Sequence, residues 1–108
     1  MALIDDDTAM AHCKADDADA KLVKLYLAAA EQAAIDYLDR GVYETEADLE
    51  AADDETGIVV NFSIKAAILL ILGHLYENRG TVVTGTIATE IPFGAKALLL
   101  LHRLEPGA

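Results

Sequence analysis

The chain has little of what several protein classes depend on. Its 108 residues include one cysteine, two prolines and no tryptophan. A single cysteine excludes an intramolecular disulfide, and with it the small secreted scaffolds that disulfides stabilise. The sequence also contains no glycine-rich phosphate loop and no HExxH, CxxC or GxSxG motif. The commonest nucleotide, zinc and serine-hydrolase sites are therefore missing.

Basic residues are scarce as well. Eight lysines and arginines stand against 19 acids, which gives a net charge of −11. The charge is uneven, because residues 1–55 carry 16 acids and four bases, whereas residues 56–108 carry three acids and four bases. Nucleic-acid affinity depends on bases that neutralise phosphates, so tight DNA binding is disfavoured.

Apolar residues are abundant but do not form long runs. They make up 54% of the chain, enough for a hydrophobic core. The longest unbroken run is Ala66–Leu72, far short of the ~20 residues that span a bilayer. We expect a soluble protein without a membrane segment, present in the cytoplasm after synthesis, with a single domain over residues 1–108.

Hydrophobic periodicity predicts a mainly α fold, a small four-helix domain. The clearest pattern is Leu22, Tyr26, Ala29, Ala33 and Tyr37, whose steps of four and three residues place them on one helix face. Pro92 suits the first turn of the last helix. We expect the four helices near residues 5–14, 18–40, 63–78 and 92–103.

Polar residues and glycines mark where these helices begin and end. The aspartates at 5–7 can cap the first helix, and Asn61 or Ser63 the third, while Gly41 stands where the second should stop. A long acidic loop is expected between the second and third helices. Thr45 resembles a cap for two helical turns within it. Short β pieces are expected at 58–60 and 82–90.

The third helix is apolar on nearly every side through Leu72, so it must be buried by the other helices or by a second subunit. This gives a set of candidate core or oligomer residues: Ile64, Ile68, Leu69, Leu72, Tyr76, Leu98 and Leu101. Glu77, Arg79 and Arg103 lie near helix ends. There they either make fixed polar contacts or are solvated charges, and both interpretations stay open.

No set of residues converges on a catalytic, cofactor or metal site. His12 and Cys13 are neighbours, and adjacent helical residues point about 100° apart. His74 lacks the further ligands that a metal needs. The acidic clusters do not follow the calcium-loop pattern. We expect no catalytic residues, no cofactor and no bound metal.

Three segments carry a family resemblance. IKAAILLILGHLYENR occupies residues 64–79, Ile91 is followed by Pro-Phe-Gly, and LLLLHR occupies residues 98–103. Together they resemble the head–tail connector proteins (adaptor or head completion proteins) of long-tailed double-stranded DNA phages. In that family YENR often ends the central helix, and a proline opens a final helix that ends in arginine.

The resemblance implies a structural function without catalysis or cofactor. Such proteins form a ring, usually of twelve copies, under the portal at the capsid vertex. The ring extends the DNA channel, passes DNA without tight binding, and offers a docking surface for the stopper or tail-completion protein. This would place the chain in the virion, at the head–tail junction.

Two other hypotheses come from the residues. An acidic inhibitor that mimics DNA would need acids spaced like phosphates on one surface, whereas these acids cluster at helix starts and turns. A small enzyme would need a convergent nucleophile, base or metal set, and the sequence offers none.

Overall fold

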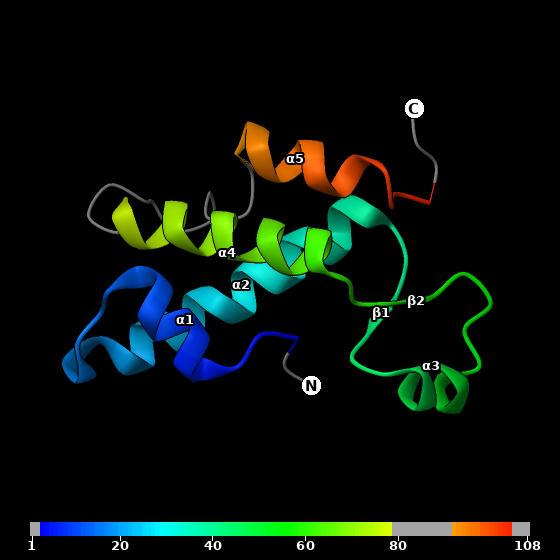
Figure 1. The fold of residues 1–108 in the computed structure, drawn as a ribbon, viewed down its shortest axis with the longest axis horizontal. Coiled ribbons are helices and arrows are strands. Elements are labelled where there is room, and N and C mark those ends of the chain that lie inside the picture. Colours follow the sequence, from blue (N-terminus) through cyan, green and yellow to red (C-terminus); the bar gives the residue numbers. More distant parts are fainter. Residues whose placement is uncertain (1–2, 79–91, 105–108) are drawn as a thin grey trace.

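The computed structural model describes residues 3–78 and 92–104, and these are mainly helical, as the sequence predicts. A 3-10 turn at Asp17–Asp19 leads into the second helix. In chain order the elements are α1 (Asp6–Cys13), α2 (Ala20–Leu38), β1 (Val42–Tyr43), α3 (Glu46–Ala52), β2 (Ile58–Val59), α4 (Phe62–Glu77) and α5 (Phe93–Leu100), shown in Figure 1. The four predicted helices correspond to α1, α2, α4 and α5.

Helix α4 lies at the centre of the fold. It packs against α2 and α5, while α1 contacts α2 and α4 (Figure 1). Its residues Ile64, Ile68 and Leu72 are completely buried. On α2 the small side chains of Ala30 and Ala34 are also fully buried, which lets two helix backbones approach closely.

Side-chain caps begin three of the helices, as the sequence predicts. The Thr8 amide donates to Asp5 Oδ1 at 2.7 Å, and the Ile64 amide donates to Asn61 Oδ1 at 2.9 Å. In α3 the Asp48 amide donates to Thr45 Oγ1 at 3.1 Å. Each cap satisfies an amide that has no partner within its helix, so these starts are determined locally.

The predicted end of α2 is wrong. The helix ends at Leu38, and Asp39 rather than Gly41 takes the left-handed conformation, with φ 57°. A Cβ at Gly41 would lie 2.9 Å from Tyr43 Oη and closer still to Asp54 Oδ2, so a larger residue there would require these two side chains to move. Helix α5 is also shorter than predicted: it ends at Leu100, and the chain then turns so that the Leu104 amide donates to the Leu38 carbonyl at the end of α2.

The predicted acidic loop is instead a small folded unit, which we name the acidic lobe (residues 42–59). Strands β1 and β2 pair in parallel, with Val42 opposite Ile58 and Tyr43 opposite Val59, and α3 connects them. The sequence predicts β2 and the two turns of α3 but misses β1. The predicted β piece at 82–90 lies outside the described residues.

Candidate assembly surface

Helix α5 has two apolar faces, and the fold uses one of them. Ala95 and Leu99 are completely buried against the core. On the other face, Phe93 is 86% exposed and Leu100 is 42% exposed, and the exposed Leu101 follows at 82%. With Ala97 they fall at steps of four, three and one, the spacing of one helix face. We name Phe93, Ala97, Leu100 and Leu101 the outer stripe.

One exposed apolar side chain of α4, that of Leu70, lies beside this stripe. Gly94 approaches Leu70, since a Cβ on Gly94 would be 3.5 Å from Leu70 Cδ1. Phe62, in the first turn of α4 and eight residues before Leu70, is 88% exposed. Leu70 is 42% exposed, so the described helices of the same chain do not bury α4 on every side, and the alternative of cover by a second subunit remains for this position. Leu70 and the outer stripe form one apolar patch. Contiguous apolar patches of this kind mark protein–protein contacts.

The chain that follows α5 is tied to the end of α2. The Leu104 amide donates to the Leu38 carbonyl at 2.9 Å. The guanidinium of Arg103 lies over the Tyr37 ring, 4.9 Å from its centroid, in a cation–π contact. Arg40 Nη1 donates to the His102 carbonyl at 3.3 Å. These contacts hold α5 in a defined orientation and so define where the outer stripe faces.

Arg40 also fastens the acidic lobe. Its Nε donates to the Thr56 carbonyl at 2.6 Å. Within the lobe, the Tyr43 hydroxyl donates to Asp54 Oδ2 at 2.9 Å. This hydrogen bond lowers the pKa of Asp54 and raises that of Tyr43, because it favours the carboxylate and the protonated phenol.

The acidic lobe presents charge of one sign. Residues 44–55 carry seven acids and no base. Glu46, Asp48, Glu50 and Asp53 are exposed. An extended field of negative charge at this end of the molecule repels polyanions.

The predicted core or oligomer residues fall into three groups. Ile64, Ile68, Leu72 and Tyr76 are buried, and the Tyr76 hydroxyl donates to Asp19 Oδ2 at 2.6 Å. Leu69 and Leu98 are half-buried at the edge of the core. Leu101 lies on the surface, in the outer stripe.

The predicted polar positions are spread apart. Glu77 is exposed in the last turn of α4, and Arg103 lies against Tyr37. Arg79 lies outside the described residues. Sequence reasoning missed Phe93, Leu100 and Arg40. The spacing of Phe93, Ala97 and Leu100 could have revealed a second apolar face on the last helix, whereas no local pattern marks Arg40.

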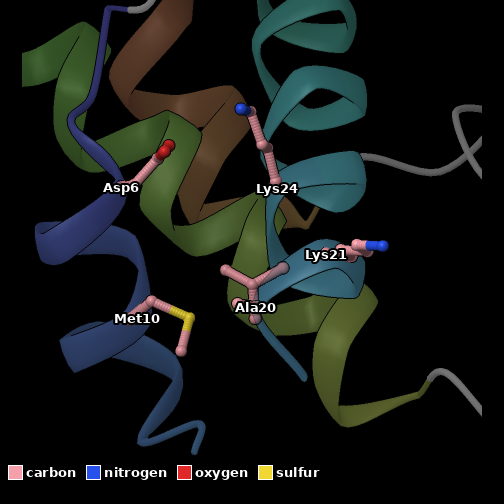
Figure 2. Close-up of a pocket in the computed structure, with 6 residues that line it drawn as sticks. Asp6, Met10, Ala20, Lys21 and Lys24 are labelled. Atoms are coloured by element: carbon pink, nitrogen blue, oxygen red, sulfur yellow. The ribbon is translucent and has the colours of Figure 1, made fainter. Parts of the chain in front are cut away.

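A pocket of about 160 Å³ opens between α1 and α2. Met10 and Ala20 face each other across it (Figure 2), and Val23 completes the apolar part of the lining. Asp6, Lys21 and Lys24 contribute to its rim. The apolar part of the lining can accept an apolar side chain.

Residues 3–78 and 92–104 contain neither a cluster of metal ligands nor a membrane-spanning helix. This part of the chain holds no group of three or more His, Cys, Asp or Glu side chains placed to bind a metal ion. The His74 ring contacts the amide of Asn78, with Nδ1 and Nδ2 3.4 Å apart. No helix in these ranges is long and apolar enough to cross a membrane.

The described residues form a small helical fold that combines an exposed apolar stripe with an acidic lobe, and such apolar patches are typical of protein–protein contacts. The family is specific: the chain belongs to the phage head–tail connectors, since the sequence model for the phage gp6-like head-tail connector protein matches residues 10–103. No curated protein and no solved structure matches the chain at a significant level. The chain is therefore a structural phage protein of the adaptor class and a virion component.

Proposed function

We propose that the chain is the repeating subunit of a ring that docks under the portal, extends the DNA channel and provides the attachment surface for the stopper or tail. The observation that carries this proposal is the family match, which spans residues 10–103. The ring would contain twelve copies, and the whole chain, residues 1–108, would act as a single domain. Assembly would begin in the host cytoplasm and end at the head–tail junction.

The outer stripe supports self-association. Phe93 and Leu101 are more than four-fifths exposed, and a side chain of this kind gains free energy when a neighbour covers it. Among the predicted candidates, Leu101 would act at this contact, while Ile64, Ile68 and Leu72 would support the protomer core. Glu77, Arg79 and Arg103 would make polar contacts at helix ends.

The acidic lobe supports a channel that passes DNA without holding it. Its seven acids without a base would repel phosphates at short range. Tight binding would stall the DNA, so an acidic lining suits passage. In this proposal some of the lobe acids face the lumen of the ring.

A reconstitution tests the proposal. The chain is mixed with purified portal protein, and the products are examined by electron microscopy and native mass spectrometry. We expect closed rings on the portal or at high protein concentration. A chain that stays monomeric at every concentration and ionic strength, and that portal fails to recruit, would contradict the connector role.

A competition assay separates the DNA-mimic hypothesis. An acidic inhibitor would displace DNA from a basic DNA-binding protein, with an affinity that falls steeply as salt rises. The connector hypothesis predicts no displacement at the protein concentrations that give rings.

A further inference from the structure

Two apolar features remain unmatched within the described part of one copy, and they lie on different sides of the molecule. The outer stripe is on α5, while the apolar pocket is formed by α1 and α2. Helix α5 packs on one side of α4, and α1 lies across the molecule from α5 (Figure 1). A ring needs one surface that meets a different surface on the next copy, and these two features satisfy that condition.

The pocket matches an aromatic side chain in size and lining. Its volume is about 160 Å³, and Met10, Ala20 and Val23 supply apolar atoms. An apolar cavity of roughly 150 Å³ accommodates a benzene molecule. Phe93, at 86% exposure, is the most exposed side chain of the outer stripe and stands in the first turn of α5. The thioether of Met10 is flexible enough to adjust to an inserted ring.

The charges around the two features also match. Lys96, three residues after Phe93, is exposed and is the one charged residue of α5. Asp6 forms part of the pocket rim, and Asp5 and Asp7 flank it in exposed positions at the start of α1. A copy that inserts Phe93 into this pocket with Lys96 turned toward α1, away from Lys21 and Lys24 on the α2 side of the rim, brings Lys96 next to three carboxylates. Contact pairs of this type fix the register of an interface.

We infer that the outer stripe of one copy packs on the α1–α2 pocket of the next copy, with Phe93 entering the pocket and Lys96 facing the acids at the start of α1. This inference rests on the proposed ring and assigns the two surfaces that build it.

Disulfide trapping tests the contact directly. In a Cys13→Ala background that keeps Phe93, Lys96→Cys and Asp6→Cys are combined in one chain, and rings formed alone or on portal are exposed to a mild oxidant. Each chain then links to two neighbours, so we expect a ladder of covalent oligomers on a non-reducing gel. The matched control pairs Asp6→Cys with Phe62→Cys, an exposed residue at the start of α4, and should give no ladder.

A binding measurement supplies a second readout. Phe93→Ser should weaken association at least tenfold in sedimentation, whereas Phe62→Ser should leave it unchanged. Both side chains are more than 85% exposed, so neither change should alter the circular dichroism spectrum of the monomer. Rings that form without the Asp6–Lys96 ladder, or rings that assemble as tightly with Phe93→Ser as with the wild type, overturn this inference and leave the connector role standing. A chain that never forms rings and is not recruited by portal overturns both.

Discussion

The guanidinium of Arg103 lies over the ring of Tyr37, with its central carbon 4.9 Å from the ring centroid. The contact joins the segment after α5 to the last full turn of α2, two elements that are 66 residues apart in sequence. It gives Arg103 a definite structural role, in which the apolar stem and the charge both contribute.

We expect Arg103→Ala to lower the free energy of unfolding by about 1 kcal/mol, the range of a partly exposed cation–π contact. Urea denaturation measures this change. Tyr37→Phe is the matched control, because it keeps the aromatic face and should cost less. If Arg103→Ala leaves both stability and ring assembly unchanged, Arg103 is simply a solvated charge at a helix end.

Neighbouring positions on α4 should respond differently to a buried charge. Leu72 is completely buried, so Leu72→Asp should cost several kcal/mol and unfold the protein. The sequence alone places Leu69 in the same interior, but Leu69 is half-buried, and Leu69→Asp should cost clearly less. Thermal melting of the two variants gives the comparison. Equal losses of thermal stability in the two variants would show that Leu69 is as inaccessible to water as Leu72.

Glu31 should make stability depend on pH. Its Oε2 accepts hydrogen bonds from the amides of Leu3 and Ile4, at 2.9 and 3.2 Å. Burial nevertheless raises the pKa of Glu31, because it penalises the charged form more than these bonds favour it. A raised folded pKa means that the folded state holds the proton more tightly. The contribution of Glu31 is then fully present below its unfolded pKa of about 4.3 and is lost as the pH rises through the folded value.

A melting series across pH tests this sign. Glu31→Gln keeps an oxygen that can accept the same hydrogen bonds but cannot ionise. Relative to the wild type, its melting temperature should rise as the pH increases from below 4 to neutrality. Gln32→Glu, on the exposed face of the same helix, serves as a control for a general charge effect. A Glu31→Gln curve parallel to the wild type at every pH would contradict the prediction.

Raising the ionic strength should strengthen the self-association of the chain. Each copy carries a net charge of −11, so copies in a ring repel one another over distances that salt screens. The apolar contact of the outer stripe is not weakened by salt in the same way. Light scattering across a sodium chloride series measures the trend. Association that falls steadily with salt would show that opposite charges, rather than apolar contact, dominate the interface.

Much of the fold can be predicted from the sequence because its determinants are local. The apolar spacing along residues 22–37 predicts α2. The side chains of Asp5, Thr45 and Asn61 each accept a hydrogen bond from the amide three residues later, so these caps are set by the local sequence. The β1–β2 pairing could not be predicted in full. It brings Val42 to Ile58 across an intervening helix, and a strand of two residues is too short to show a periodicity.

The assembly surface was predicted only in outline. The third helix, apolar on nearly every side, indicates burial by other helices or by a second subunit, and Leu101 appears among the candidate core or oligomer residues. Which side of α5 faces outward depends on how α4 packs against it, and this is a property of the tertiary structure. Asp39 illustrates the same limit, because the left-handed turn that ends α2 was expected at a glycine and falls on an aspartate.

The hydrogen bonds of Arg40 have a structural consequence. Its guanidinium donates hydrogen bonds both to the Thr56 carbonyl of the acidic lobe and to the His102 carbonyl beyond α5. Within one copy, the position of the acidic lobe and that of the segment after α5 therefore depend on the same charged group.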